Sequence, residues 1–439
     1  MPASSDGGLS EGGLSDGGLS DGGLSDGGLS DGQRPVISRL AFTAAEVIDD
    51  PYPHFAAARS QASVHWHEET GMWLAFGHAE ANAVLRSRSL GRIWTPRWPE
   101  VAMPGFELIH RHSMLENEPP VHTRLRRLVA AAFARGHVER LRPRVVALAE
   151  GLADHLAESS RDGSAVDLIA GFAEPLPVQV IAELLGIPEP DRGLLRPWSN
   201  AIVKMYEYQV SPAQRDAAEA AASEFVAYLR GLVRQRRHRP AADLISSLIA
   251  ETDSAGGRLS EDELVTTCTL LLNAGHEASV NVVGNGVLAL FGNPDQWQRL
   301  LAAEAAGQSL VGTGVEELIR FDSPLQLFER TAISDTRIGE VTVRAGEKIA
   351  ALLGSANRDP AVFEHPDRLD VGRVDNPQLG FGAGIHFCVG APLARVELQT
   401  SLRTLLRRFP ALRPATGDLS LRRSEFVIRG VAALPVLLS

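Results

Sequence analysis

Apolar residues recur with the period of an α-helix along most of the chain from residue 35 onward. Two short stretches, residues 64–67 and 72–76, have strand-like patterns, and a further group of such stretches lies between residues 325 and 353. We therefore expect a mainly α fold with small β-sheets.

The longest helical pattern begins at Ser260, where Ser260 and Glu263 have the spacing of a capping box, and it ends before Pro294. At about 1.5 Å per residue, this helix would be roughly 50 Å long. Apolar residues cover nearly every face, while polar residues such as Asn273 and Glu277 gather near its middle. The pattern predicts a buried helix that lines a cavity, and the central polar residues argue against a membrane span.

Residues 7–31 repeat Gly-Gly-Leu-Ser followed by Asp or Glu five times. Such a segment buries too little apolar surface to offset the entropy lost when its Gly-rich backbone is ordered. We expect residues 1–34 to be a disordered tail and residues 35–439 to form one folded domain.

The composition excludes several classes of protein. The 439 residues include 43 Lys and Arg against 54 Asp and Glu, and no basic run marks a nucleic-acid surface. Two cysteines, Cys268 and Cys388, are too few for a disulfide framework or a Cys-rich zinc site. With neither a secretory signal nor a transit segment at the N-terminus, the sequence predicts a cytoplasmic protein that binds neither nucleic acid nor membrane.

Cys388 lies in a Gly-rich segment, Phe381-Gly-Ala-Gly-Ile-His-Phe-Cys-Val-Gly390, that precedes a helical pattern. Glycines permit turns that aim backbone N–H groups at a sulfur, and a helix N-terminus favours negative charge. A lone Cys is usually a small buried hydrophobe, but this setting suits a thiolate. A dinucleotide-binding loop is excluded, because Phe387 occupies the position that needs a third Gly.

This decapeptide resembles the heme-binding loop of the cytochrome P-450 superfamily, F-x-x-G-x-x-x-C-x-G, and especially its bacterial members with His two residues before Cys. The resemblance extends over residues 35–439 and implies the family's fold, with a long central helix over heme b. It assigns Cys388 as the thiolate ligand of the iron, a ligand that favours O–O cleavage. It also places Phe381, Gly382 and Gly390 against the cofactor.

Two other segments resemble characteristic parts of that family. Glu317-Leu-Ile-Arg320 resembles the E-x-x-R pair of its K helix, and Arg368 would be the third member of the ion network. By itself a Glu/Arg pair at this spacing is a routine surface contact, whereas the resemblance implies a structural clasp.

Residues near 118–129 resemble the start of the family's C helix, where His122 and Arg126 share one face. The resemblance implies that these two side chains, with Arg330 and His386, bind the heme propionates through charge-assisted hydrogen bonds.

Electrons must come from another protein, because no flavin- or NAD-binding motif is visible. The resemblance implies a ferredoxin and its ferredoxin reductase as donors. Arg124, Arg127 and Arg395 would help to form a docking patch for an acidic ferredoxin, although a basic helix face is equally typical of a solvated surface.

The middle of the long helix, residues 271–279, resembles the family's A-G-x-(D/E)-T-(T/S) signature with one departure. The resemblance implies that Gly275 leaves room for dioxygen and that Glu277 delivers protons to it. Ala278 stands where the family usually has Thr and carries no hydroxyl group. Ser279 cannot simply replace that Thr, because its side chain is rotated about 100° around the helix.

Proton delivery would then need ordered water or a hydroxyl group of the substrate itself. A few bacterial macrolide-hydroxylating members look similar here, which favours a hydroxylated, polyketide-like secondary metabolite as substrate. Alternatively, Ala278 reflects drift or packing in an enzyme that relies on water alone. A third possibility is chemistry with less controlled protonation, such as ring closure, aryl coupling or desaturation.

The family's substrate pocket has walls from five segments, which correspond here to residues 89–112, 205–213, 273–278, 325–328 and 426–428. Within these segments the resemblance assigns the pocket wall to Trp94, Asn273, Ala274, Leu325, Phe328 and Val427. Each of these residues is individually as typical of a core as of a pocket.

The resemblance thus predicts a monomeric heme-thiolate monooxygenase that oxidises a small organic molecule with dioxygen. A peroxide-driven or non-hydroxylating oxidase of the same fold is an alternative. A heme-containing sensor without catalysis is a second alternative, although the presence of Glu277 argues against it.

Overall fold

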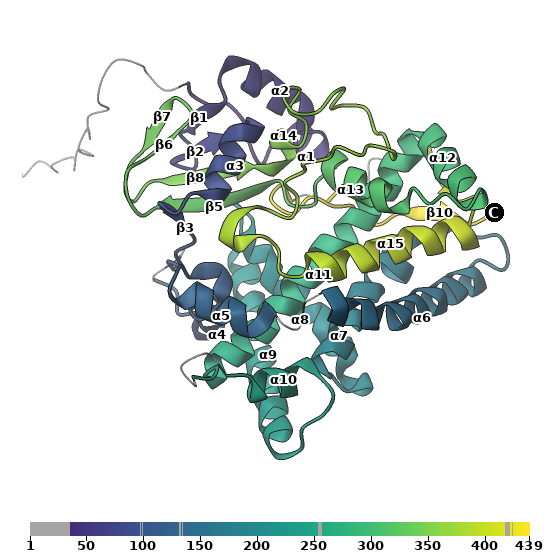
Figure 1. Cartoon of the computed structure of the whole chain (residues 1–439), viewed down its shortest axis with the longest axis horizontal. Coiled ribbons are helices and arrows are strands. Elements are labelled where there is room, and N and C mark those ends of the chain that lie inside the picture. Colours follow the sequence, from purple (N-terminus) through teal and green to yellow (C-terminus); the bar gives the residue numbers. More distant parts are fainter. Residues whose placement is uncertain are drawn as a thin grey trace, which may run out of the picture. The chain divides into compact units, whose positions relative to one another are not determined.

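A long helix, α11 (Glu261–Gly292), runs through the folded part of the chain and contacts helices from many other segments (Figure 1). Ser260 Oγ accepts a hydrogen bond from Glu263 N at 3.1 Å, and Glu263 Oε2 accepts one from Ser260 N at 2.9 Å. The next helix begins at Pro294. Both predicted ends of the helix are therefore confirmed, and most of its side chains are buried as expected.

The computed structural model describes residues 36–96, 98, 100–130, 133, 135–252, 257–417, 422–423 and 425–439. Residues 35–439 form one compact unit. The predicted tail, residues 1–34, lies outside the described residues, so its disorder stays a prediction. Within the described ranges, no helix combines the length and the apolarity that crossing a bilayer requires.

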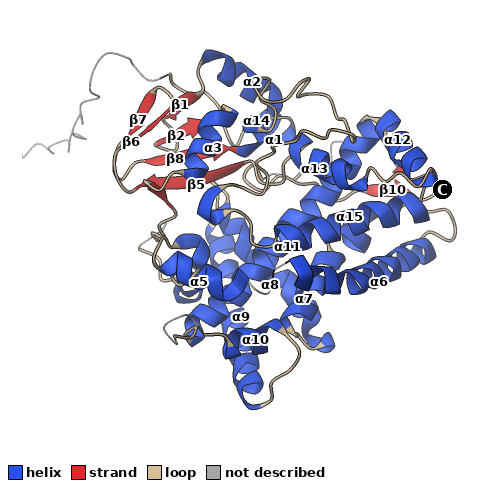
Figure 2. Ribbon diagram, in the orientation of Figure 1, coloured by secondary structure: helices blue, strands red, loops and turns tan. Residues whose placement is uncertain are grey.

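Helices make up most of the unit (Figure 2). The middle helix α11 contacts α4, α7, α8, α9 and α15, so helices enclose it on several sides. In chain order the helices are α1 (Ala45–Asp49), α2 (Tyr52–Gln61), α3 (His78–Arg86), α4 (Pro104–Arg111), α5 (Val121–Ala130), α6 (Arg135–Ser159), α7 (Pro175–Leu185), α8 (Leu195–Val203), α9 (Pro212–His238), α10 (Leu244–Ala250), α11, α12 (Pro294–Ala305), α13 (Val311–Phe321), α14 (Leu353–Ala356) and α15 (Ala391–Arg408). Four short 3₁₀ helices within the described residues are η1 (Met114–Glu116), η4 (Glu189–Leu194), η5 (Lys204–Tyr206) and η6 (Gly384–His386), and η3 (Ile169–Ala173) is a short π-helix.

The strands of the described ranges form three small sheets. The largest has the order β1-β2-β8-β5-β3, in which only the β2–β8 pair is parallel. A second sheet has the order β4-β10-β9, and β6 pairs with β7. The strands are β1 (Val64–His67), β2 (Met72–Ala75), β3 (Leu90–Gly91), β4 (Val166–Asp167), β5 (Leu327–Ala332), β6 (Thr336–Ile338), β7 (Val341–Val343), β8 (Lys348–Leu352), β9 (Arg413–Pro414) and β10 (Pro435–Leu437). The predicted mainly α fold with small sheets is confirmed.

The largest sheet is buried on both faces. In β8, Ile349 and Ala351 belong to a core cluster that includes residues of α3, whereas Ala350 and Leu352 pack in a second cluster with Phe55 of α2. Packing on both faces fixes the position of the neighbouring strand β5. The start of β5 is therefore a rigid support for side chains that reach toward α11.

Candidate active site

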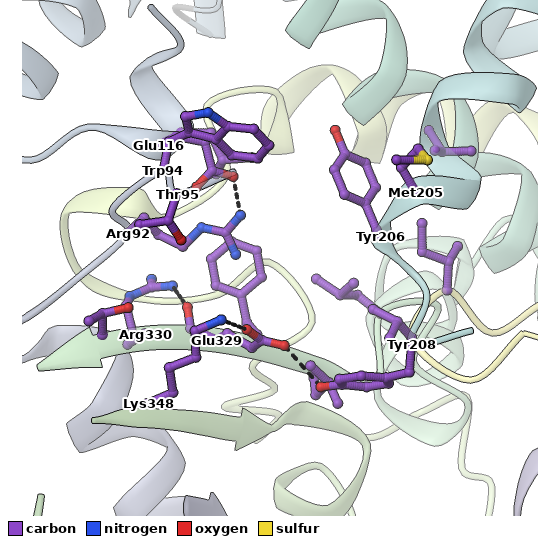
Figure 3. Close-up of a pocket in the computed structure, with 18 of the residues that line it drawn as sticks. Arg92, Trp94, Thr95, Glu116, Met205, Tyr206, Tyr208, Glu329, Arg330 and Lys348 are labelled. Carbon is purple, nitrogen blue, oxygen red and sulfur yellow. Dashed lines mark hydrogen bonds and ion pairs between the residues drawn. The ribbon is translucent and has the colours of Figure 1, made fainter. Parts of the chain in front are cut away.

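The middle of α11 forms one wall of a cavity of about 830 Å³ (Figure 3). The other walls come mainly from the loop after β3, α4, the segment 203–209, most of β5 with the residues just before it, and the turn at 427–428. These walls correspond to the five segments expected from the sequence. All residues that the sequence assigned to the pocket wall line this cavity: Trp94, Asn273, Ala274, Leu325, Phe328 and Val427.

Gly275 serves the packing of α11 and does not line the cavity. A Cβ atom at Gly275 would lie 3.0 Å from Ile181 Cδ1 of α7, closer than ordinary van der Waals contact. The absent side chain thus lets α11 approach α7. Of residues 273–278, those that line the cavity are Asn273, Ala274, Glu277 and Ala278. The expectation that Gly275 leaves room for dioxygen stays a prediction.

Ser279 also lies away from the cavity and contacts α15. Its Oγ donates a hydrogen bond to Glu397 Oε2 at 3.3 Å, and both side chains are buried. Burial raises the pKa of Glu397 to about 8, against the smaller lowering effect of the Ser279 hydrogen bond. Ser279 therefore does not supply the hydroxyl group that Ala278 lacks, and it is not placed among the residues that face the cavity.

Glu277 lines the cavity and has an ion-pair partner that the sequence did not indicate. Its Oε2 lies 3.0 Å from Arg423 Nη1, and the Glu277 side chain is 7% exposed while that of Arg423 is 24% exposed. The pair thus joins a carboxylate in the cavity wall to a guanidinium that solvent reaches.

The loop before Cys388 has the backbone geometry that its glycines allow. Cys388 N donates to Phe381 O at 2.9 Å, which closes the loop. Gly382 and Gly384 both have φ of 70°, a conformation that favours glycine. At Gly384 a side chain is also excluded by space, because a Cβ atom would lie 2.4 Å from Leu85 O.

The surroundings of Cys388 suit an anionic sulfur bound to a metal. The amides of Gly390 and Ala391 donate to the sulfur, and Arg126 adds positive charge. Burial has the larger and opposite effect, so the pKa of the free thiol is raised overall. A bound metal cation removes the thiol proton outright, and the two amides would then stabilise the thiolate.

Arg330 on β5 provides a test of whether these residues fit a heme. It is 2% exposed, and its Nη2 has no hydrogen-bond partner among the described residues. Burial and then the charge of Arg92 lower the pKa of Arg330 to about 9. The guanidinium groups of Arg92 and Arg330 each lie 4.6 Å from the centre of the Phe328 ring. A buried cation with an unused donor requires an anion, and a heme propionate is such an anion.

The other expected propionate ligands gather beside the cysteine loop. The His122 and His386 rings are 4.5 Å apart, and His386 Nε2 lies 2.8 Å from Glu118 Oε1. Arg126 Nη2 donates to Phe387 O at 2.6 Å. Burial, followed by the charges of His386 and Arg126, lowers the pKa of His122 to about 4. His122 is therefore neutral near pH 7 and suits a hydrogen-bond donor more than a cation.

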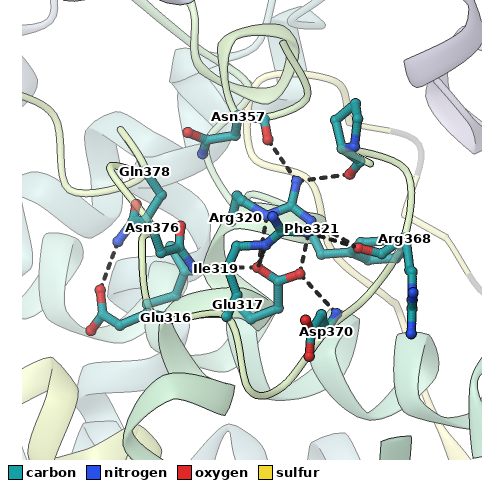
Figure 4. A network of polar contacts seen from close by, with 12 residues as sticks. Glu316, Glu317, Ile319, Arg320, Phe321, Asn357, Arg368, Asp370, Asn376 and Gln378 are labelled. Carbon is teal, nitrogen blue, oxygen red and sulfur yellow. Dashed lines mark hydrogen bonds and ion pairs between the residues drawn. The ribbon is translucent and has the colours of Figure 1, made fainter. Parts of the chain in front are cut away.

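Glu317 and Arg320 form a buried clasp on α13 (Figure 4). Glu317 Oε2 lies 2.7 Å from Arg320 Nε and Glu317 Oε1 lies 2.8 Å from Nη2, with both side chains 0% exposed. Arg320 Nη1 also donates to the carbonyls of Asn357 and Pro366, each at 2.8 Å. The pair holds the chain between α14 and the cysteine loop, which agrees with a structural role.

The third member of the clasp is Arg373, and the prediction of Arg368 is wrong. Arg373 Nε lies 3.0 Å from Glu317 Oε2, whereas Arg368 contributes its backbone carbonyl, which accepts from Arg320 Nη2 at 3.2 Å. Asp370 N donates to Glu317 Oε1 at 2.9 Å, which holds the chain just before Arg373 against the carboxylate. These long-range contacts decide which arginine faces Glu317.

Two arginines of the expected ferredoxin patch have partners within the chain. Arg124 forms an ion pair with Glu263. Arg395 Nε lies 2.6 Å from Glu316 Oε1, and its guanidinium lies over the Phe381 ring. Their positive charge is therefore partly balanced.

The segment between α8 and α9, which includes most of the range 205–213 expected to line the pocket, joins two walls of the cavity through contacts that the sequence did not indicate. The Glu207 carboxylate accepts hydrogen bonds from the backbone N–H groups of residues 426–428 at 2.9 to 3.1 Å. Tyr208 OH donates to Glu329 Oε1 of β5 at 2.9 Å (Figure 3). The partners are more than 100 residues away in sequence, so no local pattern predicts these contacts.

The comparisons with known proteins agree with this site. The cytochrome P-450 family model matches residues 195–429. The cytochrome P-450 monooxygenase PikC of Streptomyces venezuelae is 38% identical over 408 residues, 92% of this chain and 94% of PikC. The 6-deoxyerythronolide B hydroxylase of Saccharopolyspora erythraea is 38% identical, over 89% of this chain and 96% of its own. The solved structure of the bacillaene polyketide synthase cytochrome P-450 PksS of Bacillus subtilis 168 has a TM-score of 0.81 at 34% identity, covering 91% of this chain and 100% of that chain.

This likeness extends over nearly all of the chain. The buried arginine without an anion and the amides around the cysteine sulfur fit the family's cofactor. The chain belongs to the cytochrome P-450 family and is a heme b-dependent monooxygenase.

Proposed function

We propose that this monooxygenase oxidises a hydroxylated, polyketide-like secondary metabolite whose own hydroxyl group takes part in proton delivery. The observation that carries the proposal is the contrast between Ala278 and Ser279. Ala278 lines the cavity and has no hydroxyl group, whereas Ser279 donates its hydroxyl to Glu397 on α15. The place of an alcohol beside Glu277 is thus open to a substrate.

The cavity supports a substrate of this class. Its volume is about 830 Å³, of which the heme would take the part beside Arg330 and the substrate the remainder. Apolar side chains such as Leu270, Val203 and Leu325 line part of it, while Glu329, Tyr208 and other polar side chains lie elsewhere in its wall. The names of 6-deoxyerythronolide B hydroxylase and of polyketide biosynthesis cytochrome P-450 PksS point to substrates of the same chemical class.

The cofactor would be held by residues from three parts of the chain. Cys388 would ligate the iron, and Arg330, His122, His386 and Arg126 would bind the propionates. When bound, the heme supplies the site at which dioxygen is activated and an oxygen atom is transferred to the substrate. Gly382 and Gly390, which carry no side chain, would let the backbone approach the ring closely, and Phe381 would pack beside the cysteine loop.

Glu277 would hold and pass on the protons that the reaction consumes. Its carboxylate lies in the cavity wall and forms an ion pair with the partly exposed Arg423, so protons from solvent have a short polar path to the cavity. A substrate hydroxyl near Ala278 would complete this path by accepting a hydrogen bond and donating another.

We further propose that a ferredoxin, reduced by its ferredoxin reductase, delivers the electrons. The chain shows no flavin- or NAD-binding motif. Because Arg124 and Arg395 have carboxylate partners, we expect the docking surface to depend more on other cations near the cysteine loop.

The test compares Ala278→Thr with Ala278→Val, two variants of nearly equal volume that differ in the hydroxyl group. The enzyme is reconstituted with NADPH, a ferredoxin and its reductase, and the ratio of product to NADPH consumed is measured with a hydroxylated macrolactone and with its deoxy analogue. If the substrate hydroxyl delivers protons, Ala278→Thr exceeds Ala278→Val only with the deoxy analogue.

Substrate assistance is rejected if Ala278→Thr raises the coupling several-fold over Ala278→Val with the hydroxylated macrolactone. Ser279→Ala is the matched control for a nearby hydroxyl group. Its coupling remains close to that of the parent enzyme, because its hydroxyl faces Glu397.

A further inference from the structure

Four polar atoms of residues that line the cavity are buried and have no hydrogen-bond partner among the described residues. Arg330 Nη2 and Arg92 Nε belong to the two guanidinium groups beside Phe328, where a heme propionate would bind, and the other two atoms remain to be explained. One is Oδ1 of Asn273 on α11, whose residue is 6% exposed, and the other is Nε1 of Trp94 in the loop after β3. A buried polar atom that is left unpaired is costly, and such atoms are rare in folded proteins. Their presence in one cavity points to a ligand that pairs with both.

Asn273 lies one residue before Ala274 and one helical turn before Glu277, in the stretch of α11 that lines the cavity. The fold satisfies a buried Asn elsewhere on the same helix. Asn285 Nδ2 donates to Arg429 O at 3.1 Å, and Asn285 Oδ1 accepts from Arg422 Nη1 at 2.7 Å. Asn273 Oδ1, by contrast, accepts no hydrogen bond within the described residues. An apolar side chain at this position would avoid the cost of burying an unpaired acceptor.

Trp94 is held in place by ring contacts that leave its N–H free to bind a ligand. Its ring stacks on His110 with centroids 4.4 Å apart and an interplanar angle of 23°, and it also contacts Phe106. Figure 3 shows Trp94 on the same side of the cavity as Arg92 and across from Tyr206. A fixed indole with an unpaired donor suits recognition of an oxygen acceptor.

We propose that Asn273 and Trp94 are specificity-determining residues, with Asn273 binding a hydroxyl group of the substrate and Trp94 donating to a carbonyl or ether oxygen. The inference rests on the proposed function and deepens it, because it names the polar groups that the apolar skeleton of the substrate carries. A hydroxyl group both donates and accepts, so it pairs with either end of the Asn273 amide. A site with buried polar groups rejects analogues that lack their partners, since these groups then remain unpaired.

The test uses holoenzyme and two matched series of 1-alkylimidazoles, whose ring nitrogen ligates the heme iron. The alkyl arms have graded lengths and end either in a methyl or in a hydroxymethyl group. Dissociation constants come from the shift of the heme absorption band. We expect at least one arm length at which the hydroxyl-ended probe binds the parent enzyme about tenfold more tightly than its methyl-ended partner.

Asn273→Leu, which has a similar shape without polar atoms, abolishes this preference. Asn273→Asp retains an acceptor on a side chain of the same length and keeps the preference for hydroxyl-ended probes. This variant also tests the assignment if Asn273→Leu does not fold. Asn281→Leu is the matched control, because Asn281 is buried on the same helix without a partner in the described ranges and does not line the cavity. Trp94→Phe lowers affinity for ketone-ended arms and leaves the hydroxyl preference unchanged.

The assignment of Asn273 is overturned if no arm length shows a hydroxyl preference, or if Asn273→Leu keeps it. The assignment of Trp94 is overturned if Trp94→Phe binds ketone-ended arms as the parent does. A protein that shows no absorption shift with any imidazole would instead contradict the heme site itself. The proposed function is tested separately, by the coupling of the Ala278 variants. Failure of the inference and failure of the proposed function therefore give different results.

Discussion

Ser279 Oγ donates a hydrogen bond to Glu397 Oε2 at 3.3 Å, across the contact between α11 and α15. The carboxyl group is buried, and its pKa is raised to about 8, so it is mostly protonated at neutral pH. A neutral carboxylic acid can itself donate a hydrogen bond. The pair thus links the two helices beside the cysteine loop without placing a charge between them.

This pair gives a prediction about stability and pH. The pKa of Glu397 is near 8 in the folded protein and near 4.3 in the unfolded chain, so the folded state binds more protons between these values. The contribution of Glu397 to the free energy of unfolding is therefore most favourable below about pH 4 and declines as the pH rises toward 8. Glu397→Gln, which stays neutral, removes this decline. Relative to the parent, its free energy of unfolding rises by a few kcal/mol, on the order of 1.4 kcal/mol per unit of pH, between about pH 5 and 8.

The measurement is denaturant or thermal unfolding of both proteins at several pH values. The side-chain amide that Glu397→Gln introduces still accepts a hydrogen bond from Ser279, so loss of the contact does not confound the comparison. A difference between the two proteins that is independent of pH over this window contradicts the prediction.

Gly275 leads to a prediction about packing. Gly275→Val places atoms against Ile181, because even a Cβ atom would lie 3.0 Å from Ile181 Cδ1. We expect a loss of about 1 to 3 kcal/mol in the free energy of unfolding, the usual effect of overpacking. Ile181→Ala in the same chain should recover part of that loss, which a double-mutant cycle of unfolding free energies measures. Strictly additive effects would show that Gly275 has some role other than contact with α7.

The buried clasp distinguishes two arginines in one short segment. Arg373→Ala removes a cation 3.0 Å from the buried Glu317 carboxylate, and we expect a loss of about 3 kcal/mol or more together with poorer heme retention. Arg368→Ala keeps the backbone carbonyl that accepts from Arg320, so its effect should stay within about 0.5 kcal/mol. Thermal unfolding and heme content of the two purified variants check this order. Equal losses of stability in the two variants would show that the Arg368 side chain also belongs to the clasp.

Arg330 allows the cofactor and the protein to be separated. Arg330→Met removes a buried guanidinium with an unpaired donor, so we expect heme to dissociate about tenfold faster or more. The apoprotein should be no less stable than the parent apoprotein, because an unpaired buried charge is removed. Transfer of heme to an excess of an apoglobin measures the first effect, and unfolding of the heme-free proteins measures the second. Arg330→Lys keeps the charge, so its rate of heme dissociation should lie between those of the parent and of Arg330→Met. A rate in Arg330→Met equal to that of the parent would exclude a contact between Arg330 and a propionate.

Local patterns in the sequence were enough for several features of this protein. The ends of α11 follow from the Ser260 and Glu263 capping box and from Pro294, because a helix begins and ends through contacts within a few residues. The glycines around Cys388 specify the turns of its loop for the same reason. The absence of a hydroxyl group at position 278 is a property of one residue and needs no structure.

Only the tertiary structure decided which side chains meet across long distances in the chain. Arg368 and Arg373 lie in the same irregular segment, and no local pattern shows which of the two arginines contacts Glu317. The fold of that segment places Arg373 against Glu317. Glu397 stands on the apolar face of a helical pattern, a signal that sequence reasoning had available, but its partner Ser279 lies 118 residues earlier. A Cβ atom at Gly275 would meet Ile181 of α7, a contact that the sequence did not indicate, because packing sets the rotation of a helix about its axis. Local physics thus determines the elements and their ends, whereas the environment of each side chain depends on how those elements pack together.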